Sequence, residues 1–251
     1  MIVIPMAGLS RRFTEAGYDR PKYMLEAHGR SLFAHAVASF AACFESLPFL
    51  FIYRDVAGTP DFVAAECHRL GIRDMRGVVL DAPTGGQAET VALGLQRGMV
   101  DAAAPVTIFN IDTFRPGFHF PTGFDPAAVD GYLEVFRGSG ANWSYVRPAA
   151  PGSDRVAETT EKVPISDLCC TGLYHFRSAG QYLGAYADFA GGGAARLGLK
   201  ELYVAPMYNL LIVEGADIRY DLIPAEAVVF CGVPAEYDAF LARRDAAPLP
   251  G

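Results

Sequence analysis

The chain has 251 residues, of which 51% are hydrophobic and 20% charged, a composition that is typical of a compact globular protein and excludes a disordered or fibrous one. Its formal net charge of −7 argues against nucleic acid as a partner, because nucleic-acid binders usually present a basic face. Five cysteines, two of them adjacent, suggest neither a disulfide framework nor a zinc site. With no bilayer-spanning apolar stretch and no signal-peptide pattern, we expect a cytoplasmic protein with no membrane partner.

The first half of the chain alternates short apolar runs with longer amphipathic patterns. The runs predict strands and the patterns predict helices, with strands at 1–6, 48–53, 78–80 and 106–112 and helices at 31–44, 60–70 and 86–99. These strands lack the alternation of a sheet with one wet face, so both faces of their sheet are expected to be covered by helices. The predicted fold class is therefore α/β, with a doubly wound, mostly parallel central sheet and a ligand crevice at the carboxyl ends of its strands.

The second half has a different pattern, which indicates a smaller mixed or antiparallel extension. We expect strands at 132–137, 144–147, 156–162, 168–176, 218–223 and 228–231, helices at 178–189, 200–213 and 235–243, and a frayed tail at 246–251. Tyr203, Met207 and Tyr208 share one face of the predicted 200–213 helix, which favours core or a dimer surface over an acceptor pocket. Without a repeat or a linker, residues 1–251 are expected to form a single domain.

A loop rich in basic residues directly follows the first predicted strand; it reads Ala7-Gly8-Leu9-Ser10-Arg11-Arg12-Phe13, and Arg20-Pro21-Lys22 comes next. Glycine there allows backbone N–H groups to approach an anion closely. Arg12 can pair with two phosphate oxygens, and Lys22 can place a point charge on the same group. On spacing alone, a solvated surface loop is an equal alternative. The loop is neither a P-loop, which needs Gly-Lys-Ser/Thr after a four-residue gap, nor a dinucleotide fingerprint, which needs three glycines.

This loop and the later Pro21-Lys22 resemble the amino-terminal signature of the sugar-phosphate nucleotidylyltransferases. Further matches follow in the family's order over residues 1–240, namely Gly86-Gln87-Ala88, Asn110-Ile111-Asp112, Glu161-Lys162, Thr171-Gly172-Leu173-Tyr174 and Gly232-Val233-Pro234. The ordered set is far more specific than any one of its members. Within the family, the chain is most similar to bacterial capsule and lipopolysaccharide sugar-activating enzymes and to choline-phosphate cytidylyltransferases.

The resemblance implies a Rossmann-like, glycosyltransferase-A-type fold, with a nucleotide-binding half at 1–125 and an acceptor-binding half at 126–251. It implies nucleotide binding by residues 7–11 and base binding around Gly86 and Gln87, where Asp81 or Gln87 could read an exocyclic amine. CTP is slightly favoured as the nucleotide, with UTP or dTTP as alternatives. The family pattern also implies Mg²⁺ on Asp112 and a small phosphorylated acceptor near Lys162, with acceptor binding extending to Asn110, Glu161 and Gly172. A homodimer is a further expectation.

The chemistry of such a transfer agrees with these residue types. An acceptor phosphate attacks the α-phosphorus of a nucleoside triphosphate in line, and pyrophosphate leaves. Because two anions must meet, the enzyme has to neutralise charge and position the reactants, with little need for a general base. We expect Arg12 and Lys22 to hold the triphosphate, Mg²⁺ on Asp112 to bridge its oxygens, and Lys162 to hold the acceptor phosphate.

Two positions depart from the family pattern. Ser10 stands where a second glycine is usual, which is tolerable if its φ angle is negative. Phe230 and Cys231 stand where the family often has a second metal-binding aspartate, and neither of them can bind Mg²⁺. The site then holds one metal through Asp112, or uses another carboxylate such as Glu161 or Asp221.

Simpler roles exist for several of these residues. Asp112 could cap the element after its strand, Lys162 could be a solvated edge-strand lysine, and Gln87 could be an ordinary helix-start residue.

Three function classes compete. The first is a nucleotidylyltransferase that makes precursors for surface polysaccharide or lipopolysaccharide, acting on a sugar 1-phosphate or on a non-sugar acceptor such as phosphocholine or a phosphonate. The second is a nucleotide-sugar-dependent glycosyltransferase, which would usually carry Asp-x-Asp on its metal strand. The third is a catalytically inactive module, which the missing carboxylate near Phe230 favours.

Overall fold

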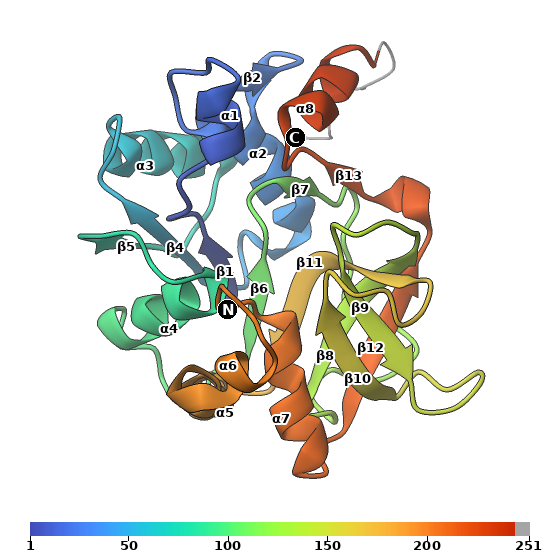
Figure 1. The fold of residues 1–251 in the computed structure, drawn as a ribbon. Coiled ribbons are helices and arrows are strands. Elements are labelled where there is room, and N and C mark those ends of the chain that lie inside the picture. The colour runs from blue at the N-terminus through green and yellow to red at the C-terminus, as the bar shows by residue number, and fades with distance from the viewer. Residues whose placement is uncertain (244–251) are drawn as a thin grey trace.

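A computed structural model describes residues 1–243 of the chain. Its main feature is a nine-stranded sheet with the strand order β10-β9-β11-β6-β1-β4-β5, in which β8 pairs with β11 and β12, off this path (Figure 1). The predicted tail at 246–251 lies outside the described residues. Within residues 1–243, no helix combines the length and the apolar character that a bilayer crossing requires.

Four parallel strands form one end of this sheet, as the unbroken apolar runs predict. They are β5 (Met75–Leu80), β4 (Phe49–Arg54), β1 (Ile2–Pro5) and β6 (Val106–Phe109). The pairs β1–β4, β1–β6 and β4–β5 are all parallel. Every residue of β1 and of β6 is buried, because helices cover both faces of the sheet.

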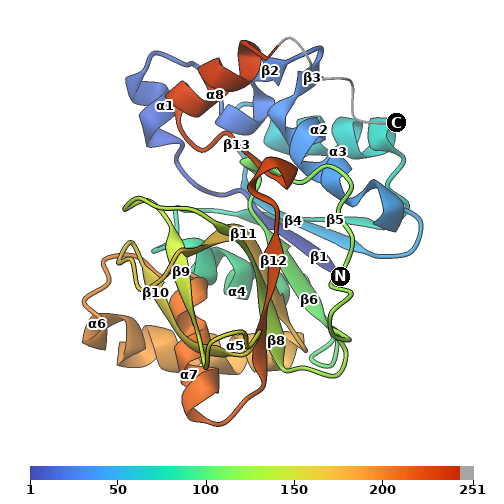
Figure 2. The ribbon, with the colours of Figure 1, turned by 90° about the vertical axis from the view of Figure 1, so that its right-hand side faces the viewer.

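Two groups of helices provide this cover (Figure 2). Buried side chains of α4 (Gln87–Arg97), α5 (Ala179–Asp188) and α7 (Tyr208–Val213) pack on one face of the sheet. Those of α2 (Leu32–Val37), α3 (Thr59–Leu70) and α8 (Pro234–Leu241) belong to the core cluster of the other face. The doubly wound arrangement is therefore confirmed.

The second half of the chain extends the same sheet. The strands involved are β8 (Gly131–Arg137), β9 (Ser144–Pro148), β10 (Val156–Glu161), β11 (Leu168–Phe176) and β12 (Ile218–Ile223). Strand β11 pairs antiparallel with β6, β8 and β9, and β9 pairs antiparallel with β10. Only β12 runs parallel to its neighbour, β8. The predicted antiparallel extension is thus present, joined to the parallel part through β11.

Short elements complete the fold. They are α1 (Arg11–Glu15), η1 (Lys22–Met24), β2 (Glu26–Ala27), β3 (Arg30–Ser31), η2 (Ala38–Cys43), β7 (Thr113–Phe114), η3 (Phe189–Gly193), α6 (Ala194–Arg196), η4 (Ala205–Met207), η5 (Ala225–Ala227) and β13 (Val229–Phe230). Strands β7 and β13 pair with each other, and β2 forms a hairpin with β3.

Some predicted boundaries are wrong. The predicted 31–44 helix is divided into α2 and the 3₁₀ helix η2, inside which Phe40 has non-helical backbone angles. The predicted 200–213 helix begins only at η4, so Tyr203 precedes it, whereas Met207 and Tyr208 are fully buried. Those two residues are therefore core rather than a dimer surface.

The order of the parallel strands positions the ligand crevice. The chain runs from β1 through β4 to β5 on one side of β1, and then α4 returns it to β6 on the other side. Strand order thus reverses between β1 and β6. Ligands of open α/β sheets bind beyond the carboxyl ends of strands at such a point. The loop after β1 and the segment after β6 are consequently the place to look for an active site.

Candidate active site

The loop after β1, residues 7–13, offers a row of backbone donors. Within residues 1–243, no protein acceptor bonds the N–H groups of residues 7–12. From the end of β4, Arg54 donates from Nε to the carbonyl oxygen of Ala7 at 3.0 Å and so fixes the start of the loop. A cavity of about 270 Å³ is lined by Gly8, Leu9 and Ser10 together with Arg54. Free N–H groups beside a cavity are suited to an anion.

Ser10 corrects the expectation of a negative φ. Its φ is +49° and its ψ is 32°, which is the left-handed helical region. A side chain in that region costs about 1–2 kcal/mol relative to right-handed backbone, and glycine avoids this cost. The glycine that the family usually has here therefore matches the backbone that this loop adopts, and Ser10 adopts it under strain.

We predict that Ser10→Gly raises the free energy of unfolding by about 0.5–1 kcal/mol, because relief of strain exceeds the added flexibility of the unfolded chain. Ser46→Gly is the matched control. Ser46 is an exposed turn residue that is absent from the non-glycine residues with positive φ in the described chain. The free energy of unfolding of the Ser46→Gly variant should fall by a similar amount. Thermal unfolding measures the stability of both variants. A Ser10→Gly variant that is less stable than the parent would contradict the claim that Ser10 is strained.

Lys22 and Asp112 lie in direct contact, although they are far apart in sequence. Asp112 comes just after β6, and its Oδ2 lies 2.6 Å from Nζ of Lys22 in η1. Both side chains are largely covered, with 20% and 23% of their surface exposed. No helix follows Asp112, so its carboxylate does not act as a helix cap. The predicted phosphate-binding lysine and the predicted metal carboxylate therefore share one point at the switch between β1 and β6.

Asn110, Gln87 and Gly172 form a second contact group. Gln87 is the first residue of α4, as the simpler interpretation expects, and its Nε2 also donates to Oδ1 of Asn110 at 2.5 Å. The backbone N–H of Asn110 donates to the carbonyl oxygen of Gly172 at 3.1 Å. Gly172 has a φ of +98°, and a Cβ there would overlap the Asn110 amide. Predicted nucleotide-side and acceptor-side residues are thus in contact.

Lys162 and Glu161 lie at the end of β10, on the acceptor side. Lys162 has a φ of +59°, and its Nζ donates to the hydroxyl oxygen of Tyr203 at 2.7 Å. The ammonium is therefore held rather than simply solvated. The Glu161 side chain is only 7% exposed, and burial raises its pKa, while a hydrogen bond from Ser144 and the charge of Lys162 partly offset that effect.

Tyr174 is a buried residue of β11 that pairs with Ile108 of β6. Burial raises the pKa of this phenol well above its usual value, and the charges of Cys170, Glu161 and Asp112 add to the effect. Strand β11, which carries Tyr174, pairs with β6 and with β9 and so joins the strand before Asp112 to the acceptor-side strands.

Three predicted residues are not brought into these contacts. Arg11 and Arg12 lie on α1 with exposed side chains, and no ion pair holds either of them within the described chain. Asp81 is 83% exposed and pairs with Arg97 at 3.0 Å. Arg97 is at the far end of α4 from Gln87, about 15 Å along the helix axis. The Asp81 carboxylate is thus directed away from the Gln87–Asn110 pair.

The residues that replace the second metal aspartate have clear structural roles. Phe230 packs against Trp143 and Phe136, with ring centroids 4.5 and 5.3 Å away. Burial, followed by the charges of Glu236 and Asp112, raises the pKa of the Cys231 thiol to about 12. Sulfur is also a soft ligand, whereas Mg²⁺ prefers oxygen. Burial raises the pKa of Asp221, the other candidate carboxylate, and the charges of His119 and Arg115 partly offset that effect.

Mg²⁺ is nevertheless compatible with the site. Within residues 1–243, no three or more His, Cys, Asp or Glu side chains are grouped as a metal-ligand set. However, Mg²⁺ in nucleotide enzymes is commonly held by one or two carboxylates plus phosphates and water. Asp112 can supply one such carboxylate just after β6, which pairs with β1, the strand that leads into the loop of free N–H groups.

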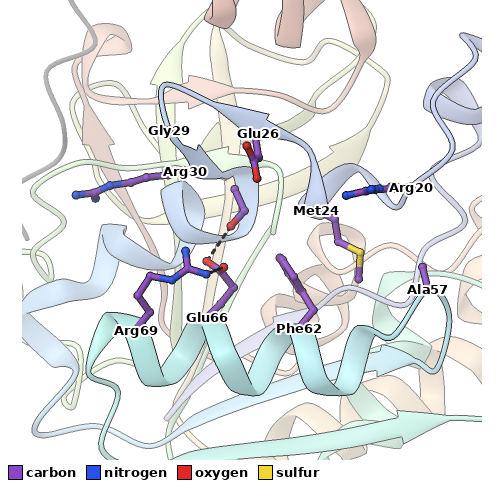
Figure 3. A pocket seen from close by; sticks show the side chains of 10 residues that line it. Arg20, Met24, Glu26, Gly29, Arg30, Ala57, Phe62, Glu66 and Arg69 are labelled. Carbon is purple, nitrogen blue, oxygen red and sulfur yellow. Dashed lines mark hydrogen bonds and ion pairs between the residues drawn. The ribbon is translucent and has the colours of Figure 1, made fainter.

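A larger cavity of about 530 Å³ lies elsewhere, between α3 and the β2–β3 hairpin. Figure 3 shows Phe62, Glu66 and Arg69 projecting into it from α3, with Arg20 and Met24 on the opposite side. None of the predicted catalytic or binding residues lines it. The larger cavity thus lies apart from the residues that the sequence predicts for the site.

Comparisons with known proteins decide the family. A scan against protein-family models and a search of curated proteins find no match. Among solved structures, a nucleoside-diphosphate-sugar pyrophosphorylase from Vibrio cholerae RC9 is 53% identical, with a TM-score of 0.92 over 97% of this chain and 100% of that chain. The chain belongs to the sugar-phosphate nucleotidylyltransferase family.

Solved structures with low sequence identity share the fold. An inositol-1-phosphate CTP transferase from T. maritima has 13% identity and a TM-score of 0.73 over 95% of this chain and 92% of that chain. A UTP-bound UGPase from Acinetobacter baumannii has 13% identity and a TM-score of 0.69 over 96% and 91%. The resemblance recognised in the motifs is confirmed, and the chain is an enzyme of the nucleotidyltransferase class.

Two residues in contact with the candidate site are not predicted from the sequence. Arg54 is a charged residue directly after an apolar strand, a signal that could have placed it at the crevice. Tyr203 gave no such signal, because it was assigned to a helical stripe together with Met207 and Tyr208. It instead contacts Lys162 from a segment that precedes the helix.

Proposed function

We propose that this enzyme transfers a nucleoside monophosphate from a nucleoside triphosphate to a small phosphorylated acceptor and releases pyrophosphate. The observation that carries the proposal is the contact between Lys22 and Asp112 at 2.6 Å, beside a loop with free backbone N–H groups at the strand switch point. A cation, a carboxylate and free donors at one point are what a triphosphate and its metal require.

The proposed mechanism depends mainly on charge. The N–H groups of residues 7–12, with Arg12 and Lys22, bind the triphosphate and neutralise the charge that builds up as pyrophosphate leaves. Lys162 binds the acceptor phosphate and brings its oxygen in line with the α-phosphorus. Mg²⁺ on Asp112, when bound, polarises phosphate oxygens and offsets their charge. No residue needs to act as a general base, because the attacking phosphate oxygen is already ionised.

The nucleobase is proposed to bind at Gly86 and Gln87, with CTP, UTP and dTTP as candidates. The sequence favours CTP slightly, because Asp81 or Gln87 could read an exocyclic amine, and Asp81 pairs with Arg97 on the surface. Gln87 carries both a donor and an acceptor, so its amide can pair with either pyrimidine base. The acceptor is proposed to be a sugar 1-phosphate, with phosphocholine or a phosphonate as the alternatives to test.

The wider setting of the enzyme is also a proposal. Residues 1–125 would serve mainly the nucleotide and residues 126–251 mainly the acceptor, within one domain. The product would be an activated precursor for surface polysaccharide or lipopolysaccharide. The five cysteines in the described chain are all free and buried, which is compatible with a reducing cytoplasm.

A panel assay tests the proposal. Purified protein is mixed with Mg²⁺, with each nucleoside triphosphate in turn and with sugar 1-phosphates, phosphocholine and aminoethylphosphonate, and pyrophosphate is measured. We expect release only when one pyrimidine triphosphate and one acceptor are both present. Tight binding of a nucleotide sugar without pyrophosphate release would favour a glycosyltransferase instead, and absence of both would favour an inactive module.

A further inference from the structure

Tyr203 makes two contacts with Lys162. Its hydroxyl oxygen accepts a hydrogen bond from Nζ at 2.7 Å, and the ammonium lies 4.7 Å from the centroid of its ring. Both hydrogen bonding to a charged group and the cation–π contact favour one position of the ammonium. Tyr203 belongs to the segment between α6 and η4, which is far in sequence from Lys162.

Leu202, the residue before it, is bonded to the start of α4. Its N–H donates to the carbonyl oxygen of Gly85 at 2.9 Å, and its carbonyl oxygen accepts from the N–H of Ala88 at 2.8 Å. Gly86 lies between these bonds with a φ of +153°, and a Cβ there would come within 2.5 Å of the Leu202 backbone. Only glycine therefore allows this close approach of the two segments.

Lys162 needs such support, because its own backbone does little to direct its side chain and its ion pair with Glu161 is long, with Nζ 3.8 Å from Oε1. Its φ is +59°, a left-handed conformation, and its N–H donates to the carbonyl oxygen of Trp143 at 2.9 Å. These features fix the turn after β10, but four rotatable bonds separate the turn from the ammonium, whose side chain is 48% exposed. An unsupported lysine of this kind samples many rotamers and loses entropy when it binds a phosphate.

We propose that Tyr203 is a positioning residue that holds the Lys162 ammonium for the acceptor phosphate, and that Leu202 fixes Tyr203 against the turn at residues 85–88. Two adjacent residues thereby tie the acceptor lysine to the base-binding turn. The inference deepens the proposed function and rests on it for the role of Lys162. The link from Leu202 through Tyr203 to Lys162 is a property of this chain and does not depend on the proposed function. In support, the hydrogen bond that Lys162 donates to Tyr203 raises the pKa of Lys162 above its usual value, and the charges of Glu161 and Glu201 add to the effect.

The lysine content of the chain allows a test that does not depend on turnover. Lys22, Lys162 and Lys200 are its only lysines, so reductive methylation with ¹³C gives few NMR signals, which single Lys→Arg variants assign. We expect Tyr203→Phe to lower the pH at which the Lys162 signal titrates, because the hydrogen bond that favours the ammonium is lost while the ring is kept. Inorganic phosphate, used as the probe, should bind Lys162 about tenfold more weakly in this variant, the scale of one hydrogen bond to a charged group.

Gly86→Ala tests the second link. Gly86 lies against the Leu202 backbone and makes no contact with Lys162, so the 202–203 segment is the direct route by which this variant would change the Lys162 signal. Tyr186→Phe, a half-buried tyrosine on α5, and Gly184→Ala, whose Cβ would meet no atom within 4 Å, are the matched controls. They should leave the Lys162 signal unchanged.

Kinetics with the acceptor found in the panel assay complete the test. Tyr203→Phe should raise the KM for the acceptor about tenfold, with kcat and the KM for the triphosphate changed less than about twofold. In a Lys162→Ala background the same substitution should have no further effect. A Lys162 signal and a phosphate affinity that are identical in Tyr203→Phe and the parent would overturn the inference. The expected NMR changes in a protein that never releases pyrophosphate would reject the proposed function and leave the positioning role standing.

Discussion

Replacing Lys22 by alanine is expected to lower kcat/KM by about a hundredfold or more, which corresponds to roughly 3 kcal/mol of transition-state stabilisation. The reason is that the ammonium lies 2.6 Å from Asp112 at the strand switch point, where the charge of the departing pyrophosphate is proposed to develop. Lys22→Arg should recover only part of the rate, because a planar guanidinium does not reproduce a compact point charge. Steady-state pyrophosphate release measures both variants.

The control for this prediction is Arg137→Ala. Arg137 forms an ion pair with Asp167 on the surface, and the two side chains are 64% and 59% exposed. Loss of such a pair costs about 0–1 kcal/mol of stability and should leave kcat/KM unchanged. Lys22→Ala with a rate near that of Arg137→Ala would remove Lys22 from the mechanism.

Replacing Asp112 by asparagine should have an effect of similar size, again about a hundredfold or more in kcat/KM. The amide has nearly the shape of the carboxylate, so packing around the Cys231 N–H, which bonds to the Asp112 carbonyl oxygen at 2.8 Å, is kept. What changes is the charge that would bind Mg²⁺ and that now pairs with Lys22. The Mg²⁺ concentration for half-maximal rate should rise as well.

Asp167→Asn is the matched control for Asp112→Asn, since Asp167 is exposed and pairs only at the surface. Both variants should unfold within a few degrees of the parent protein, because neither opens a cavity. An Asp112→Asn enzyme that keeps its rate and its Mg²⁺ requirement would show that the metal is held elsewhere.

The parallel part of the fold is predictable from sequence because its strands are unbroken apolar runs. Strands β4 and β6 pair with β1, one on each side of it, and both faces of this part of the sheet are buried. Their sequences therefore do not alternate between apolar and polar residues. Helix ends are less predictable. The 3₁₀ segment η2 and the late start of the helix after Tyr203 depend on tertiary packing, which short-range patterns do not contain.

The contact of Lys22 with Asp112 follows from two sequence observations. Asp112 ends a buried strand and Lys22 follows the loop after a neighbouring one, so topology alone directs both toward the same edge of the sheet. The direction of a side chain beyond its strand is harder to infer. Asp81 also ends a parallel strand, yet it turns to Arg97 on the surface, since an exposed arginine on α4 is near enough to pair with it.

Backbone angles in loops were the least accessible feature. Nothing in the local sequence distinguishes the positive φ of Ser10 from an ordinary turn, because serine adopts that region rarely and at a cost. The roles of Leu202 and Tyr203 depend on the close approach of two segments that are far apart in the sequence. Gly86 is the only sequence feature related to this approach, and the neighbouring residues do not explain why a glycine is needed there.

The central claim, that Lys22, Asp112 and Lys162 surround one place where two phosphates react, is tested most directly by a crystal structure with Mg²⁺, a nucleoside triphosphate and an acceptor phosphate. We predict phosphate oxygens within about 3 Å of Lys22 Nζ and of the N–H groups after β1, and the acceptor phosphate within the same distance of Lys162. Binding of the triphosphate in the cavity between α3 and the β2–β3 hairpin, with Lys22 and Asp112 still paired and untouched, would contradict it.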